Sequence, residues 1–146
     1  MTAVNSNLVP GGWAEFQDFD LRFYSQDGSL KEDSAWMQWS TNLFQAIRET
    51  GPEPHPGSKL EGWVRDAGFQ KVHCEKFQIP IGPWAKGKRL KDLGMFNLAQ
   101  LLDGLEGFSL RPLCQQRGLD RDEVLELLEN VRAEMTDRRI HGQFDL

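Results

Sequence analysis

The hydrophobic pattern near the N-terminus predicts extended chain. Apolar and polar residues alternate over residues 19–24, as in a strand with one buried face. Residues 13–16 carry three apolar side chains in a different phase and predict a more deeply buried stretch. We therefore expect the strand to leave its sheet near Gln17 or Asp18 and to close in the turn at residues 25–29.

A helix is predicted over residues 34–50 by apolar side chains at helical spacing. This stripe is formed by Trp36, Trp39, Leu43, Phe44 and Ile47. Asp33 is the expected N-cap, and Gly51, followed by a proline, gives a left-handed stop. Residues 51–57 hold three prolines and predict a rigid loop in which His55 is exposed.

A short helix and a strand are expected to follow with almost no loop between them. Ser58 and Glu61 form a Ser-x-x-Glu capping box for a helix that Gly68 ends. Residues 70–81 are rich in β-branched and aromatic side chains and predict a strand, in which Pro80 must lie at an edge or an end. This order of helix, glycine and strand is typical of an α/β sheet.

The last part of the chain is predicted to be mainly helical. Leucines recur along residues 86–107 in a broad stripe, with Gly94 as its weak point. Asp120 and Glu123 cap a second long helix. Its buried face consists of Val124, Leu127, Leu128, Val131 and Met135. Residues 140–146 begin another strand.

Composition narrows the functional classes. Of the 146 residues, 22 are acidic and 17 are basic, with no long run of either sign. Neither nucleic acid nor a membrane surface is therefore an expected partner. No apolar run approaches membrane-spanning length, and the two cysteines and three histidines show no metal-ligand spacing. We expect one soluble domain of the cytoplasm or the nucleus, without a bound metal.

Three stretches and one histidine carry a resemblance to a known family. VPGGWAEFQDFDL, residues 9–21, resembles the Pro-Gly-Gly turn and fifth strand of class I S-adenosylmethionine-dependent methyltransferases, most closely the LaeA-type fungal methyltransferases of secondary metabolism. LEGWVRDAGFQKV, residues 60–72, is similar to the helix and strand that follow in that fold. GPWAKGKRLKDLGMFNLAQLLDGLEGFS, residues 82–109, resembles the family's insertion, and His141 matches its late histidine.

The resemblance implies an α/β, partial Rossmann-like methyltransferase fold of C-terminal strands with flanking and inserted helices. Residues 1–8 would be a short tail, residues 9–146 the C-terminal part of the domain, and about 84–118 the helical insertion. In such enzymes the first strands and a glycine-rich turn hold S-adenosylmethionine. No Gly-x-Gly occurs in the sequence. We therefore expect the N-terminal cofactor-binding strands to be absent, and this chain alone to lack most of the S-adenosylmethionine site.

The resemblance also points to candidate site residues. Asp18 and Asp20 flank the fifth strand, where a carboxylate orients a nucleophile or accepts its proton, and His141 is the third catalytic candidate. Either aspartate could equally be a solvated or helix-capping carboxylate. The candidate substrate pocket consists of Glu15, Phe23, Trp36 and Trp84. A place in the hydrophobic core is the alternative for the tryptophans.

The implied function is methyl transfer from S-adenosylmethionine to a small secondary metabolite or to a protein. A second hypothesis is a truncated, non-catalytic paralogue that acts as an interaction module. It would self-associate or bind a protein partner through the apolar face that its missing half would cover. A third hypothesis is that a partner supplies the missing half and restores catalysis. The unpaired edge of a half sheet also predicts aggregation of the isolated chain.

Overall fold

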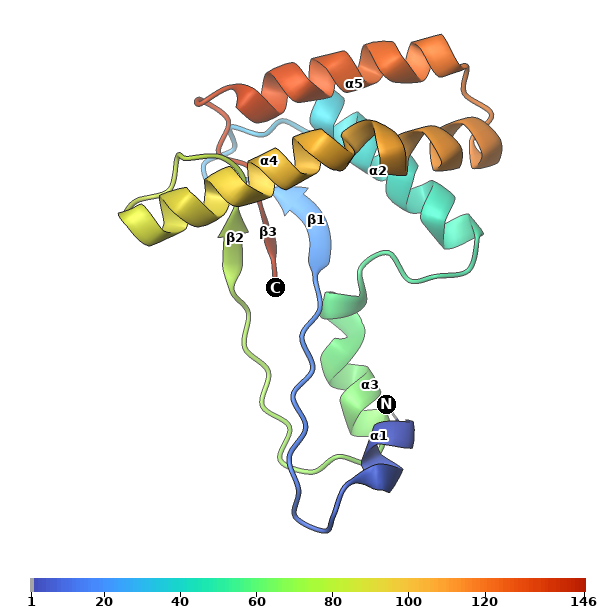
Figure 1. Ribbon diagram of the computed structural model, residues 1–146, viewed down its shortest axis with the longest axis vertical. Coiled ribbons are helices and arrows are strands. Elements are labelled where there is room, and N and C mark those ends of the chain that lie inside the picture. Colours follow the sequence, from blue (N-terminus) through green and yellow to red (C-terminus); the bar gives the residue numbers. More distant parts are fainter. Residues whose placement is uncertain (1) are drawn as a thin grey trace.

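The computed structural model describes residues 2–146 (Figure 1). The architecture is mixed α/β, as expected, with a small sheet of three strands and helices beside it. In chain order the elements are α1 (Thr2–Asn7), β1 (Asp20–Tyr24), α2 (Ala35–Glu49), the 3₁₀ turn η1 (Pro56–Lys59), α3 (Leu60–Asp66), β2 (Gln78–Pro80), α4 (Lys88–Arg111), the π-helical turn η2 (Pro112–Gln116), α5 (Arg121–Thr136) and β3 (Gln143–Asp145). No helix within residues 2–146 is long and apolar enough to cross a membrane.

The last strand lies in the middle of the sheet, in the order β1-β3-β2. β3 runs antiparallel to both neighbours, and Asp145 is the register partner of Asp20 on one side and of Gln78 on the other. β1 and β2 are therefore parallel to each other. The helices α2 and α3 lie in the long connection that such parallel strands require.

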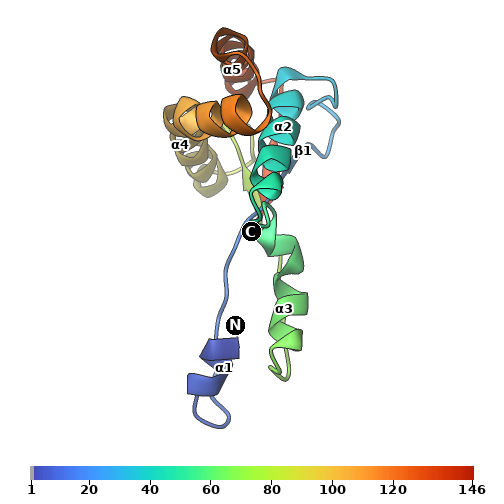
Figure 2. The same cartoon turned by 90° about the vertical axis from the view of Figure 1, so that its right-hand side faces the viewer.

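The hydrophobic core lies where α2, α4 and α5 pack together across one end of the sheet (Figures 1 and 2). The predicted stripe of α2 is confirmed, with Trp36 and Trp39 almost fully buried. Trp39 Nε1 donates to the Ser109 hydroxyl at 2.8 Å, which joins α2 to the end of α4. The predicted capping box of Asp120 and Glu123 starts α5. The fully buried face of α5 consists of Val124, Leu128, Val131 and Met135.

Two predicted helix caps are wrong. The side chain of Ser34 caps α2 by accepting from the Met37 amide at 3.2 Å, so the expected cap at Asp33 is one residue too early. The capping box predicted at Ser58 does not form, because this hydroxyl donates to the His55 carbonyl at 2.9 Å. A 3₁₀ turn at this point takes the place of the predicted cap, and α3 begins at its end.

Residues 13–19 and 72–77 are extended but unpaired over most of their length. Trp13 is 85% exposed, so the burial predicted for this stretch is wrong, and the strand predicted to begin at Gln70 is reduced to β2. Both predictions failed because the segments lack strand partners: in the described chain, backbone–backbone hydrogen bonds reach only the end of each segment that is next to the sheet. An extended segment without a neighbouring strand leaves its amides and carbonyls to water. With α1 and α3 the two segments form an arm that stands away from the long helices (Figure 2).

The helix α4 crosses the end of β2 at a contact between two glycines. The Gly82 amide donates to the Gly94 carbonyl at 2.8 Å, and Gly94 is buried. A Cβ atom at Gly94 would lie 2.0 Å from the Gly82 oxygen, which no side chain can tolerate. Asn97 adds a hydrogen bond from Nδ2 to the Pro80 carbonyl at 3.1 Å. The expected weak point of this helix is therefore the place where α4 attaches to the sheet.

Candidate functional site

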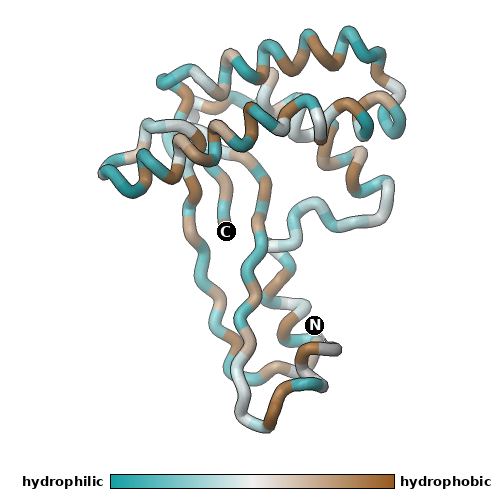
Figure 3. The backbone as a smooth tube through the Cα atoms, viewed as in Figure 1, coloured by the Kyte–Doolittle hydropathy of each residue, from teal (hydrophilic) through white to brown (hydrophobic). Residues whose placement is uncertain are grey.

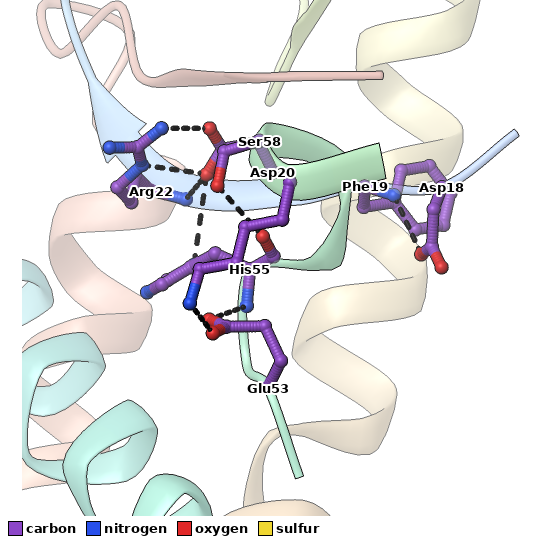
Figure 4. A network of polar contacts seen from close by, with 8 residues as sticks. Asp18, Phe19, Asp20, Arg22, Glu53, His55 and Ser58 are labelled. Carbon is purple, nitrogen blue, oxygen red and sulfur yellow. Dashed lines mark hydrogen bonds and ion pairs between the residues drawn. The ribbon is translucent and has the colours of Figure 1, made fainter. Parts of the chain in front are cut away.

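A polar cluster of two buried residues and one exposed arginine lies at the start of β1 (Figure 4). Asp20 is 5% exposed, and His55, from the loop after α2, is 9% exposed. Arg22 Nε donates to Asp20 Oδ1 at 2.8 Å, and a second guanidinium nitrogen of Arg22 donates to Oδ2. His55 Nδ1 lies 3.7 Å from Asp20 Oδ1, which is too far for a hydrogen bond but close enough for the charges to interact. We call Asp20, Arg22 and His55 the Asp20 cluster.

The proline-rich loop packs directly on β1 and thereby places His55 beside Asp20. The Gly57 amide donates to the Phe19 carbonyl at 3.0 Å. A Cβ atom at Gly57 would lie 2.7 Å from the Asp20 nitrogen, so only glycine permits this approach. Glu53 accepts a hydrogen bond from the His55 amide at 3.1 Å and holds the loop from its other side.

Burial and charge determine the protonation states in the Asp20 cluster. Burial raises the pKa of Asp20, but the hydrogen bonds and charge of Arg22, helped by His55, outweigh it and hold that pKa below its usual range. Burial lowers the pKa of His55, and the charge of Asp20 opposes this only in part. At neutral pH Asp20 is therefore ionised and His55 is neutral.

This arrangement is suited to proton transfer. His55 Nδ1 is buried beside Asp20 and has no hydrogen-bond partner among residues 2–146, so a bound molecule could pass a proton only to the other ring nitrogen, Nε2. A neutral imidazole can accept a proton, and the Asp20 carboxylate beside it would stabilise the imidazolium. Arg22 makes Asp20 itself a weak base, so the carboxylate is better suited to positioning and charge balance than to accepting the proton.

A pocket of about 390 Å³ opens between the Asp20 cluster and α2. Phe23 and Phe44 contribute apolar walls, and Arg22, Arg48 and His55 also line it. Its volume is within the range of sites that bind small molecules. We call it the α2 pocket. Its combination of aromatic and cationic side chains suits a small molecule that carries a polar substituent.

The other two acidic candidates, Asp18 and Glu15, lie outside the Asp20 cluster. Both are exposed. Asp18 Oδ1 accepts from the neighbouring Phe19 amide at 2.8 Å (Figure 4), and Glu15 Oε1 accepts from Gln17 Nε2 at 2.6 Å. Both residues line a larger cleft between the two unpaired extended segments. Of the acidic candidates, only Asp20 lies beside His55.

His141 and Trp84 form a second group of their own. Their rings stack with centroids 5.1 Å apart, and His141 Nδ1 lies 2.6 Å from Asp27 Oδ2. Hydrogen bonds from Ser29 and His141 lower the pKa of Asp27 to about 2. No contact found in the described chain links this group to either aspartate candidate. The structure therefore does not bring the three catalytic candidates together.

Trp36 and Phe23 both belong to the core. Trp36 is 0% exposed, its ring centroid lies 5.6 Å from that of Phe23, and it lines neither pocket described above. Phe23 is 5% exposed and borders the α2 pocket. The two candidate pocket residues are therefore neighbours, and only Phe23 lies at a pocket wall.

The expectation that His55 is exposed is wrong. Its ring packs edge-on against Phe44 with centroids 4.7 Å apart, and the loop is seated on β1. The sequence held one signal for this arrangement, a single histidine in a loop stiffened by three prolines and followed closely by Gly57. Such rigidity keeps a side chain in one place, but the surface on which it packs is distant in sequence.

One glycine-bounded connection of the structure offers no backbone site for S-adenosylmethionine, the cofactor that the resemblance implies. The connection from β2 to α4 has glycines with positive φ at both ends, Gly82 and Gly87. The first of these glycines cannot bind the cofactor through its amide, because the Gly82 amide already donates to the Gly94 carbonyl and α4 packs against that peptide. Residues 2–146 also contain no group of His, Cys, Asp and Glu side chains that could hold a metal ion.

We predict that His55 makes the stability of the chain depend on pH. Its pKa in the folded chain is below the unfolded value near 6.5, so the unfolded state binds more protons between these two values. The contribution to the unfolding free energy should be complete above about pH 6.5 and decrease as the pH falls through the folded pKa. Urea unfolding at a series of pH values checks this. His55→Gln should remove the dependence in this window, and His73→Gln, at an exposed histidine, should retain it. The same slope in both variants would contradict the assignment.

Comparison with known proteins finds relatives for nearly the whole chain. No family model and no solved structure matches it. The probable methyltransferase tdiE of Emericella nidulans is 34% identical over 137 residues, which are 94% of this chain and 43% of that protein. Methyltransferase pytC of Aspergillus terreus is 34% identical over 140 residues, which are 96% of this chain and 43% of that protein.

A relative with the LaeA name also matches most of the chain. The protein-methionine methyltransferase laeA of Chaetomium globosum is 32% identical over 133 residues, which are 90% of this chain and 41% of that protein. The chain thus spans about two fifths of the length of each of these relatives. Over almost all of its own length the chain is similar to fungal proteins that are named methyltransferases, and LaeA-type regulators of secondary metabolism are among its relatives.

Proposed function

We propose that these residues form the substrate-side part of an S-adenosylmethionine-dependent methyltransferase that acts on a small secondary metabolite. The observation that carries the proposal is the similarity to tdiE over 94% of the chain. S-adenosylmethionine supplies the methyl group in such enzymes. Because the sequence has no Gly-x-Gly turn, we propose that a partner polypeptide provides the cofactor-binding strands.

The sheet supports a partial Rossmann-like arrangement of residues 9–146, with residues 1–8 as a tail. β1 and β2 are parallel and joined through helices, which is the repeating unit of Rossmann-like folds. The proposed helical insertion, about 84–118, corresponds to α4 and η2. We therefore assign the chain to the C-terminal part of the methyltransferase domain.

In the proposed reaction His55 takes up the proton that the methyl acceptor loses. As the acceptor oxygen or nitrogen gains the methyl group, its O–H or N–H bond breaks and the proton passes to the neutral imidazole. Asp20 balances the charge of the imidazolium, and Arg22 holds Asp20 in position. Methyl transfer depends mainly on aligning the acceptor in a dry pocket, and the aromatic walls of the α2 pocket serve that purpose.

A chimera tests this proposal. This chain replaces the matched 43% of tdiE, and transfer of a labelled methyl group from S-adenosylmethionine to small molecules of a fungal extract is measured. We expect labelled product from the chimera. The His55→Gln chimera should lose about a hundredfold in rate, and the His73→Gln chimera should not. A folded chimera that binds cofactor without transferring methyl groups would contradict the function, and an active His55→Gln chimera would contradict the role of His55.

The chain by itself is predicted not to respond to S-adenosylhomocysteine. A ligand that binds only the folded state adds about 2.7 kcal/mol of stability at a hundredfold excess over its Kd. We expect the thermal midpoint, followed by circular dichroism, to stay unchanged with excess ligand. A midpoint that rises with ligand concentration would show that residues 2–146 hold a cofactor site after all.

An interaction module without catalysis is the second candidate, and the exposed aromatic side chains of the arm favour it. Trp13 is 85% exposed and Phe77 is 52% exposed. Exposed apolar patches of this kind mark surfaces that other protein covers. On this alternative the chain binds a protein partner or a second copy. The folded chimera would then transfer no methyl group.

A further inference from the structure

One face of α2 forms the long wall of the α2 pocket. Four residues of this wall recur every three or four positions and therefore share one side of the helix. They are Met37, Thr41, Phe44 and Arg48. From Met37 to Arg48 the wall is about 16 Å long. Hydrophobic positions alternate with hydrophilic ones along α2, and the end of the helix is hydrophilic (Figure 3). The pocket therefore has apolar walls and a cationic end.

Aromatic rings line the α2 pocket on both sides of its opening. The rings of Phe23 and Phe44 have centroids 6.0 Å apart, and His55 packs edge-on against Phe44. Phe23 is held in place by the core, and Phe44 is half-buried. A flat aromatic ring packs well on such side chains, either edge to face or offset-stacked. The walls are therefore suited to an aromatic ligand.

Arg48 supplies a positive charge that has no ion-pair partner among the described residues. Its guanidinium forms neither an ion pair nor a side-chain hydrogen bond within that part of the chain. Two carboxylates of this region are already paired, Asp20 with Arg22 and Glu53 with Lys59. One positive charge is thus left at the α2 pocket, in a chain whose net charge is -5.

The charge of Arg48 reaches the part of the pocket that can accept a proton. Burial is the largest cause of the lowered pKa of His55, and the charge of Arg48 adds to it. Both side chains line the α2 pocket, so one small ligand can contact both. Arg48 also lies in the last turn of α2, where a positive charge stabilises the helix. That second role by itself predicts no preference among ligands.

We propose that the α2 pocket binds a hydroxylated aromatic carboxylic acid, with its carboxylate on Arg48, its ring against the aromatic walls and its hydroxyl at His55. A carboxylic acid is ionised at neutral pH, and its two oxygens match the fork of a guanidinium. Nε2 of the neutral imidazole accepts from the hydroxyl. This inference rests on the proposed function, and it names the chemical class of the methyl acceptor.

The test compares two probes that differ in one charge. Binding to this chain is measured with 6-hydroxy-2-naphthoate and with its neutral amide, which keeps the ring and the hydroxyl. The fluorescence anisotropy of each probe is followed at neutral pH without S-adenosylmethionine. We expect the acid to bind at least about tenfold more tightly than the amide.

Arginine variants locate the source of this preference. Arg48→Gln should bring the two affinities to within about twofold of each other, and Arg48→Lys should keep part of the preference. Arg138→Gln is the control, because it removes the same charge at an exposed position outside the α2 pocket and should keep the full preference. Amide chemical shifts should change in α2 and in the loop at residues 51–57, and circular dichroism shows that each variant is folded.

Several results would overturn the proposal. They are equal binding of acid and amide to the parent chain, a full preference in Arg48→Gln, and an equal loss of preference in Arg138→Gln. Chemical shift changes confined to the arm, or no saturable binding of the acid at millimolar concentration, would do the same.

The binding result can be told apart from the methyl-transfer result. Labelled product from the tdiE chimera, together with equal binding of acid and amide, would overturn the proposed ligand class and leave the proposed function in place. Selective binding of the acid, together with a folded chimera that transfers no methyl group, would support the ligand site and contradict the function.

Discussion

Replacing Gly94 by alanine is expected to destabilise the chain by more than about 4 kcal/mol. The new Cβ would lie 2.0 Å from the Gly82 oxygen and 3.0 Å from the Gly82 carbonyl carbon. Both atoms belong to the backbone, so no side-chain rotation can relieve the overlap. Either α4 must move away from the sheet or the turn after β2 must rearrange, and both changes break the hydrogen bond from Gly82 to Gly94.

Gly107 in the same helix is the matched control. A Cβ atom there would meet nothing within 4 Å, and the position is exposed. Gly107→Ala should therefore stabilise the chain by about 0.5–1 kcal/mol, because alanine is the better helix former. Urea unfolding followed by circular dichroism measures both variants. If Gly94→Ala unfolded at the midpoint of the parent chain, α4 would not be attached to β2 through this glycine.

The helices could be predicted from the sequence because their signals are local. The apolar stripe of α2 and the capping box of α5 each lie within one element, and both are confirmed. The N-cap of α2 was missed by one residue, because Asp33 and Ser34 are both good caps and only the backbone geometry decides between them. The glycine contact of α4 was missed because Gly82 and Gly94 meet only in the folded chain.

The sequence allowed the extended segments to be recognised, but it did not allow their burial to be predicted. Residues 13–16 have the composition of a buried strand, yet Trp13 is exposed because no strand lies beside it in the structure described. A helix forms its own hydrogen bonds, whereas a strand depends on partners that can be far away in sequence. The same holds for residues 70–77, of which only the end next to β2 meets β3.

The candidate site shows the same division between local and distant information. Asp20 was a candidate from its place at the strand, and its burial beside Arg22 is a contact between near neighbours in sequence. His55 was missed because its burial arises where Gly57 meets β1, a contact between separate parts of the chain. His141 was a candidate by resemblance alone, and its partner in the structure is Asp27.

Truncating Trp36 to alanine is expected to lower the unfolding free energy by about 3–5 kcal/mol. The side chain is 0% exposed and packs against Phe23. Gly142 closes over it, since a Cβ atom there would lie 2.3 Å from the indole ring. Removal of the indole would leave a cavity between α2 and the sheet. Trp36→Phe should cost less, because the indole N–H has no hydrogen-bond partner among residues 2–146 and only volume is lost.

The measurement also decides between the two roles that the sequence left open for Trp36. If the tryptophan belongs to the core, its truncation lowers the stability of the chain. If it lies at a pocket wall, its truncation lowers the affinity for substrate and leaves the thermal midpoint nearly unchanged. Trp13→Ala is the control, because Trp13 is 85% exposed and its truncation should leave the midpoint in place. Two results together would contradict the core assignment: a Trp36→Ala chain with the thermal midpoint of the parent, and a Trp36→Ala chimera with tdiE that binds its acceptor less tightly. Trp36 would then be a residue of the substrate pocket.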